Sequence, residues 1–404
     1  MSRTVPIRVE ATGAGRPRAD AVGIPPRVPT VTGVRLHGFH DGTLYGTRYR
    51  TLLREGPTGS FRQVGELPVP ASGRDGLSYR LKTTRGWKST LCRLVGRFPS
   101  TNVWPLGDTA LLATADNYVF VSRDRGDTWT VSRTLPDSSS PMGVLPTGVC
   151  VHNGAIYLGE YPLASSATPR LLRSTDLGES WETILELEGV RHVHAVQTDP
   201  YTGELWVTTG DSGTECRIGR VRDGNLEVVG SGSQQWRAVE LAFTPDAIVW
   251  GVDSVYRERN PILRLERSDF GDGSPETLHE ASSSIYYATS LTVGSERWIV
   301  VSTAMEAGTD STGPDDQTAH SDRACVLAAS SSTDFSRWHE VATYEKRRVP
   351  VDRWNPGASV PVANAYVFLD SDPDRGVVTN PYNTARDGGA VRLYPPAYFA
   401  TLES

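Results

Sequence analysis

Short runs of β-branched, aliphatic and aromatic residues alternate along the chain with turn-forming Gly, Asp, Asn and Pro. Runs of four to six such residues between turns are typical of β-strands, whereas an amphipathic helix needs apolar positions three and four residues apart over a longer stretch. Long helical patterns are nearly absent, so we predict an all-β fold. Clear examples of these runs are 110–114, 118–122, 155–158, 204–208, 247–250 and 297–302.

The expected strands group into units of four, as in the blades of a β-propeller. We therefore predict a single β-propeller domain over residues 31–404, with seven four-stranded antiparallel blades. Six or eight blades also fit, because the first and last units are irregular. Residues 1–30, rich in Pro, Arg and Gly, would form an N-terminal arm that could supply a strand closing the ring. The units lie at about 31–95, 101–140, 142–190, 191–233, 234–282, 284–345 and 356–398.

Two octapeptides, 122–129 and 174–181, share the pattern Ser-x-Asp-x-Gly-x-x-Trp. The Ser and Asp side chains can accept hydrogen bonds from backbone N–H groups of a tight turn, Gly tolerates a positive φ, and Trp can fold back to pack between strands. Partial versions follow at near-regular spacing, which supports a repeat. They contain Asp223, Asp269 and Asp334.

The interval before Asp334 is longer than the others, because a Gly/Thr/Asp-rich stretch, 307–322, is added there. We expect it to be an extended hairpin loop, which would be either an exposed tip or a lid.

The two octapeptides resemble the Asp-boxes of the sialidase-like BNR-repeat superfamily. In that superfamily the boxes are structural turns on the face away from the ligand site, and its members include glycosidases, lyases, receptors and assembly factors. The resemblance therefore implies the fold and leaves the activity open. Sialidases carry an Arg-Ile-Pro motif near the N-terminus, to which Ile7-Arg8 and 24–27 correspond poorly.

The central part of the chain is similar to uncharacterised microbial BNR-repeat proteins linked to polysaccharide metabolism. The resemblance covers about the middle half of the chain. It rests on 191–194, 209–211, 235–237 and 250–254.

Composition and charge narrow the classes of function. The net charge of −6 argues against a large basic surface for nucleic acid. The four cysteines lie far apart, which suggests buried thiols in a reducing compartment rather than a zinc cluster or a disulfide framework. The N-terminus lacks an apolar stretch of signal-peptide length, and no window is apolar enough for a membrane span. We expect a cytoplasmic protein that binds neither nucleic acid nor membrane.

The sharpest chemical feature is His192-Val193-His194. The two-residue period of a strand puts both imidazoles on one face. They could bind a metal, one could act as a base while the other holds a substrate oxygen, or both could hydrogen-bond to neighbouring inner strands. No cofactor is firmly implied; a divalent metal held by His192 and His194 is the candidate. Arg191 and Arg237 begin the fourth and fifth units, where a guanidinium would suit a carboxylate.

Four residues are further acid–base candidates. Tyr286 and Tyr287 begin the sixth unit with opposite orientations, so at most one faces the channel, where it could be a nucleophile or a general base. Glu160 and Glu306 end apolar strands, where partial burial would raise the pKa of either carboxyl group.

Four more residues are candidates for substrate binding. Asp211 and Asp253 also end strands, but turn capping accounts for them, and we rank them below the glutamates. Gln235 and Trp236 precede Arg237 and complete this group.

Two functions from different classes remain. The first is a carbohydrate-active enzyme, a glycosidase or a polysaccharide or oligosaccharide lyase, acting on an anionic glycan at the central channel mouth. The alternative is a non-catalytic glycan- or protein-binding or assembly propeller. A polar pocket near His194 would favour the enzyme, and an apolar plug would favour the binding protein. The oligomeric state and the substrate are left open.

Overall fold

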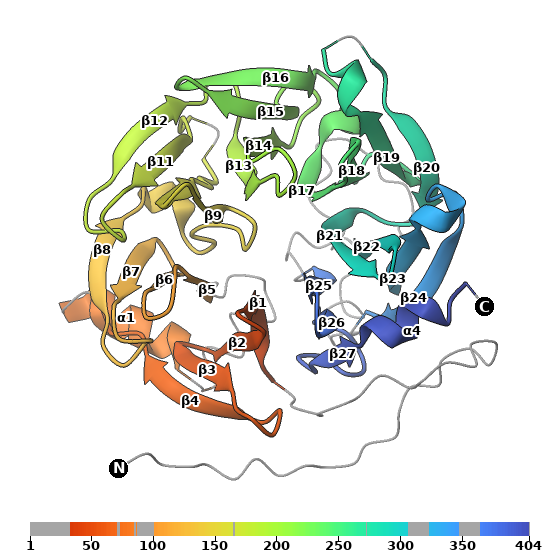
Figure 1. Ribbon diagram of the computed structural model, residues 1–404. Helices are drawn as coiled ribbons and strands as arrows, with labels where there is room; N and C mark the ends of the chain where they lie inside the picture. Colours follow the sequence, from red (N-terminus) through yellow and green to blue (C-terminus); the bar gives the residue numbers. More distant parts are fainter. Residues whose placement is uncertain are drawn as a thin grey trace, which may run out of the picture.

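The computed structural model describes residues 33–70, 73–84, 86, 101–164, 166–271, 273–305, 323–346 and 364–403. The proposed N-terminal arm, Cys92, Glu306 and the loop 307–322 lie outside these residues. The strands are arranged as a ring around a central axis (Figure 1), and the fold is an all-β propeller, as expected. Among the described residues, no helix combines the length and apolar character that a membrane span requires.

Five sheets contain four antiparallel strands each, ordered as along the chain. They are β1 (Arg35–His40), β2 (Thr43–Arg48), β3 (Thr51–Glu55) and β4 (Phe61–Glu66); β5 (Thr101–Pro105), β6 (Leu111–Ala115), β7 (Tyr118–Ser122) and β8 (Thr130–Thr134); β9 (Val149–His152), β10 (Ala155–Gly159), β11 (Arg170–Ser174) and β12 (Glu182–Glu186); β13 (His192–Thr198), β14 (Leu205–Gly210), β15 (Arg217–Arg222) and β16 (Asn225–Ser231); and β17 (Ala238–Phe243), β18 (Ala247–Val252), β19 (Asn260–Glu266) and β20 (Glu276–Ala281).

The remaining strands form one sheet of seven, because β22 pairs with both β21 and β25. The number of blades stays a prediction, since the last two expected units are continuous here. The strands of this sheet are β21 (Ile285–Val293), β22 (Glu296–Met305), β23 (Arg323–Ser330), β24 (Trp338–Glu345), β25 (Ala365–Asp372), β26 (Gly376–Tyr382) and β27 (Arg392–Tyr394).

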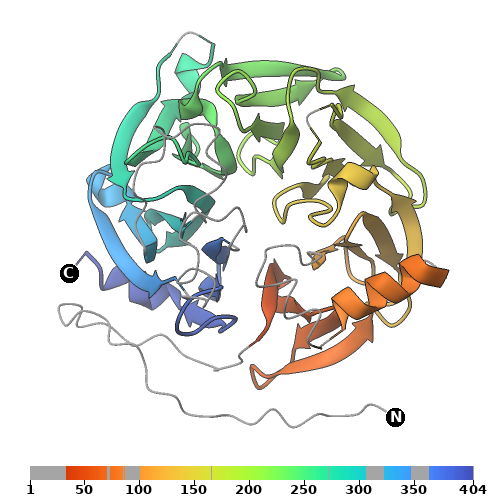
Figure 2. The same cartoon turned by 180° about the vertical axis from the view of Figure 1, so that it is seen from behind.

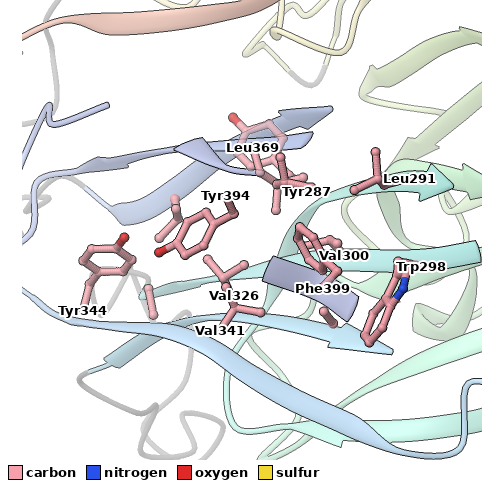
Figure 3. Close-up of a cluster of buried hydrophobic side chains, with 14 of the residues drawn as sticks. Tyr287, Leu291, Trp298, Val300, Val326, Val341, Tyr344, Leu369, Tyr394 and Phe399 are labelled. Atoms are coloured by element: carbon pink, nitrogen blue, oxygen red, sulfur yellow. The ribbon is translucent and has the colours of Figure 1, made fainter. Parts of the chain in front are cut away.

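Burial changes from the inner to the outer strands of a sheet. Every residue of β14 and β18 is buried, whereas no residue of β8 or β12 is. The inner strands are covered on both faces by neighbouring sheets, so they read as apolar runs, whereas outer strands carry polar residues. In the seven-stranded sheet, Trp298 packs near Phe399, and Tyr344 and Tyr394 lie in the same core (Figure 3).

In the part of the chain that the structure describes, two α-helices interrupt the strand pattern. Helix α1 (Gly73–Thr83) follows the first sheet and lies on its outside, as the rear view shows (Figure 2). Its apolar Leu77 and Leu81 are exposed while Tyr79 is buried. The sequence therefore shows no continuous apolar stripe from which this helix could be predicted. The other helices are α4 (Pro396–Ala400) and the 3₁₀ turns η1 (Asp137–Ser139), η2 (Gln234–Trp236), η3 (Arg267–Asp269) and η4 (Ser331–Thr333).

The two complete Ser-x-Asp-x-Gly-x-x-Trp turns join the third and fourth strands of their sheets. In the first, the Ser122 hydroxyl accepts a hydrogen bond from Gly126 N at 2.8 Å, and Asp124 accepts one from Thr128 N at 2.8 Å. Trp129 Nε1 donates to Gly126 O. The second turn repeats the Ser and Asp bonds through Ser174 and Asp176.

The partial motifs form other kinds of turn. Asp223 and Gly224, both with positive φ, form the tight turn between β15 and β16. Asp334 bonds to the Arg264 guanidinium rather than to its own turn. Only the complete motifs therefore make the expected set of turn hydrogen bonds.

Candidate functional site

A polar cluster lies at one rim of the central channel, where the innermost strands begin and the second strands of the sheets end. His192 is the first residue of β13, Asp211 follows β14 and Asp253 follows β18. Arg237 directly precedes β17. Because neighbouring strands are antiparallel, these chain positions meet at the same edge of two adjacent sheets.

A β-bulge places His194 in this cluster. Val193 pairs with Thr209 and Ala195 pairs with Thr208, so His194 has no partner in β14. Such a bulge re-aims a side chain. Gly210 is required opposite it, because a Cβ atom there would lie 2.7 Å from His194 Cε1 and 3.2 Å from Arg237 Cγ.

Asp211 is the centre of the cluster. Its carboxylate oxygens lie 3.0 Å from His192 Nε2 and 3.5 Å from His194 Nε2. They also lie 3.1 Å from Arg191 Nη1 and 3.2 Å from Arg237 Nη2. Burial acts to raise the pKa of Asp211, but the contacts with the two histidines outweigh it and hold the pKa well below its usual range. Asp211 is therefore an ionised carboxylate at neutral pH.

Each imidazole of the pair faces two acceptors. His192 Nδ1 lies 3.3 Å from Pro162 O, and His194 Nδ1 lies 3.1 Å from Ala238 O, while both Nε2 atoms face Asp211. A neutral imidazole has one N–H, so one of its two contacts joins a lone pair to an oxygen acceptor. Burial lowers the pKa of His192, and Asp211 offsets this only in part, which favours the neutral ring. The two imidazoles together thus have too few N–H donors for the oxygen atoms that they face, unless additional protons or a cation are bound.

Tyr161, which the sequence reading missed, covers the histidines. Its ring stacks on His192 with centroids 3.8 Å apart and lies 6.2 Å from the His194 ring. Burial raises the pKa of Tyr161 well above its usual value, so the phenol stays protonated. The residue directly follows Glu160 at the end of an apolar strand, and this adjacency was the available signal.

Other candidate residues have structural partners. Arg237 contacts Asp253 as well as Asp211, and Arg191 contacts Asp211, so neither arginine is left for a ligand carboxylate. The buried Glu160 is held by Arg170 through two hydrogen bonds of 2.8 and 2.7 Å, which opposes the expected role as acid or base.

Two residues that precede Arg237 also differ from expectation. Trp236 is buried and stacks on Trp250, so it belongs to the core rather than to a binding surface. Gln235 accepts a hydrogen bond from the Trp250 indole through its backbone oxygen. Its neighbour Gln234, which is not among the sequence candidates, donates to Asp211 O, as does Arg237.

Tyr286 and Tyr287 lie in another part of the channel lining. Tyr287 is buried against Tyr366 and Phe368, and burial raises its pKa well above the usual value. The Tyr286 hydroxyl accepts a hydrogen bond from Asn364. Both tyrosine rings contact Tyr366, on β25.

The contacts of the acidic residues therefore differ from those expected from the sequence. Asp211 organises the cluster and Asp253 shares its Arg237, whereas Glu160 is locked in an ion pair and Glu306 lies outside the described residues. In the sequence, an Asp at the end of a strand that caps its own turn looks the same as one that binds side chains from another sheet.

Comparisons with known proteins support the architecture. No model of a protein family and no curated protein matches the chain. A chain in the crystal structure of the mitotic checkpoint complex is similar over 98% of both chains, with 12% identity and a TM-score of 0.50. The α-L-arabinofuranosidase Arb93A from Fusarium graminearum, solved with an iminosugar inhibitor, is 14% identical and is covered over 93% of its length by 74% of this chain, with a TM-score of 0.43. At such identities the likeness to the first of these structures shows the fold alone.

Proposed function

We propose that the chain is a carbohydrate-active enzyme that acts on an anionic glycan at the mouth of the central channel, with His192, His194 and Asp211 as its reactive centre. The observation that carries the proposal is the shortage of hydrogens around the two imidazoles, each of which faces two acceptors. Purely structural clusters satisfy their buried polar groups. A buried group that is not satisfied is a candidate for binding a proton or a ligand.

A divalent cation is one way to satisfy the cluster. His192, His194 and Asp211 offer three ligand atoms within 4.8 Å of one another. The contacts of both Nδ1 atoms with backbone carbonyls would orient the Nε2 lone pairs towards the cation. Arg191 and Arg237 share the charge of Asp211 and weaken its hold on a dication. A bound cation would act as a Lewis acid towards a substrate carboxylate.

Among the two reaction classes, the geometry favours a lyase over a two-carboxylate glycosidase. A glycosidase needs one protonated carboxyl group as acid, usually one whose pKa is raised. Here the pKa of Asp211 is lowered, and Asp253 contacts the same guanidinium nitrogen. In the cluster without a cation, a neutral imidazole such as that of His192 could instead remove the proton α to the carboxylate of a uronate. The electron pair of that C–H bond would form the new double bond as the β carbon–oxygen bond breaks, and the departing oxygen would take up the proton from the imidazolium.

The alternative is a non-catalytic glycan- or protein-binding propeller. The observation in its favour is that both imidazoles are only 2% exposed and that the surrounding charges are paired within the cluster.

The test is a turnover screen with oligogalacturonates and sialyl oligosaccharides, with chelator and with Mn²⁺ or Zn²⁺ added back. Absorbance of an unsaturated product reports a lyase, and reducing ends without absorbance report a hydrolase. We expect His194→Gln to lower turnover by about 100-fold or more. The matched control His152→Gln, at the far end of β9, should keep it. Binding of these sugars by the wild-type chain without turnover would overturn the enzyme in favour of the binding protein.

A further inference from the structure

A second polar group lines the channel at the same rim. Arg35 is the first residue of β1, Tyr366 is the second of β25, and Tyr382 is the last of β26. Together with Tyr287 they line one narrow cavity. In Figure 1, β1 and β25 lie across the centre of the ring from β13. A ligand in the channel mouth would therefore meet this group on one side and the histidines on the other.

The backbone holds Arg35 rigidly in this position. The Asn380 side chain accepts a hydrogen bond from Leu36 N at 3.0 Å and donates one to Val34 O at 3.1 Å. It also donates to Ala390 O at 2.8 Å. The residues on both sides of Arg35 are thus tied to the last sheet of the ring, which fixes the origin of its side chain.

Within the part of the chain that the structure describes, the Arg35 guanidinium has no counter-ion. Among the described residues, no carboxylate lies within ion-pair distance of it, and its nitrogens make no hydrogen bond. Its neighbours are the phenols of Tyr287, Tyr366 and Tyr382. Burial raises the pKa of both Tyr287 and Tyr366, so these phenols stay neutral. A half-buried arginine without an anion is costly, in contrast to Arg237 with its two aspartates.

The acidic side chains on the channel strands have other partners. Glu240 accepts a hydrogen bond from Ala288 N at 2.9 Å, and Asp370 accepts one from Phe39 N at 2.7 Å. Burial raises the pKa of Glu240 well above its usual value and that of Asp370 to about 6. Burial and the charge of Arg35 lower the pKa of His37, so that ring is neutral. Neither carboxyl group forms an ion pair with Arg35, and the charge of Arg35 is not among the causes that shift the pKa of Glu240 or Asp370.

We infer that Arg35, Tyr287, Tyr366 and Tyr382 form a subsite for a small monovalent anionic group, the carboxylate of a uronate unit. A guanidinium binds a carboxylate through two parallel hydrogen bonds, and phenol hydroxyls can donate further ones. The cavity has room for about one water molecule, so one carboxylate oxygen would enter it while the sugar ring stays outside. The inference rests on the proposed function in that the channel takes an anionic glycan. It moves the carboxylate site from Arg191 and Arg237 to Arg35.

The test is calorimetric titration of the full chain with sodium galacturonate at constant ionic strength. Galactose serves as the neutral control and acetate as the bare carboxylate. We expect Arg35→Gln to weaken galacturonate binding about tenfold or more, because a charge-assisted hydrogen-bonded pair is lost. Arg35→Lys should keep part of the affinity. Arg62→Gln, which changes an exposed arginine on β4, should match the wild type.

The outcomes separate this inference from the proposed function. Equal galacturonate binding by the wild type and Arg35→Gln, or no binding by the wild type, would overturn the subsite. Equal binding of galactose and galacturonate would do the same, and acetate binding alone would reduce the subsite to a general carboxylate site. If a folded Arg35→Gln protein loses galacturonate binding and the wild type turns over no glycan, the subsite is supported and the proposed enzymatic function is overturned.

Discussion

The outer turn at Ser122 and the channel-rim cluster around Asp211 both use buried or half-buried polar side chains, but they find their partners at different distances along the chain. Ser122 meets Gly126 N four residues away. Asp211 meets Arg191 and Arg237, 20 and 26 residues away. The outer turn satisfies its own groups within one hairpin, whereas the rim depends on the register of two adjacent sheets.

The two regions also differ in how completely their polar groups are satisfied. The Ser and Asp of the outer turn bind N–H and O–H donors of the same turn. At the rim, two imidazoles and a carboxylate face one another with too few hydrogens. Local saturation is characteristic of a structural turn, and a shortage of donors indicates a site that binds something else.

The largest expected effect is that of Asp211→Asn. Removing this carboxylate would leave Arg191, and in part Arg237, without a counter-charge, so the free energy of unfolding should fall by about 3 kcal/mol or more. The control Asp223→Asn, at the tip of an outer hairpin, should change it by less than about 0.5 kcal/mol. Urea unfolding measures both. Equal effects of the two substitutions would show that the aspartates of the rim and of the outer turns contribute equally to the free energy of unfolding.

The second prediction concerns pH. The pKa of Asp370, in the channel, is raised by burial to about 6. The folded state therefore binds this proton more tightly, so the contribution of Asp370 to the free energy of unfolding should be largest below about pH 4 and fall by up to about 2–3 kcal/mol as the pH rises through about 6. Hydrogen bonds from Thr128 lower the pKa of Asp124, which should give the opposite slope below about pH 4.

Chemical unfolding between pH 3 and 8 checks this contrast. Asp370→Asn should flatten the fall between about pH 4 and 6, leaving the share due to Glu240, whose pKa is also raised by burial. An unchanged slope would show that Asp370 is not the group that titrates.

The smallest expected effect is at the outer turns. Ser122→Ala leaves the buried Gly126 N–H without its acceptor, which should cost about 1–2 kcal/mol of unfolding free energy. Ser174→Ala should cost the same, because Ser174 makes the same bond to Gly178 N. The double variant should be additive in urea unfolding. The control is Ser268→Ala, because the Ser268 hydroxyl bonds to the exposed Asp269. If Ser122→Ala or Ser174→Ala costs clearly less unfolding free energy than this control, the account is contradicted.

Much of the fold follows from local patterns. The apolar runs at 110–114 and 247–250 lie in β6 and β18, and the two complete Ser-x-Asp-x-Gly-x-x-Trp motifs make the expected turns. Helix α1 could not be predicted from the sequence, because its leucines are exposed and so do not mark the face that is buried. Of the site, the pairing of His192 with His194 on one face was foreseen, and the rings lie 5.3 Å apart.

The sequence by itself determined most of the strands, the five four-stranded units and the two complete outer turns, because their interactions connect residues a few positions apart. Only the tertiary structure decided that Asp211 rather than Glu160 meets the histidines, that Arg191 and Arg237 are neutralised, and that Arg35 is not. These outcomes depend on which strand ends meet at the channel rim. Ion pairing and burial there are set by side chains from different sheets, whose distances no local pattern encodes.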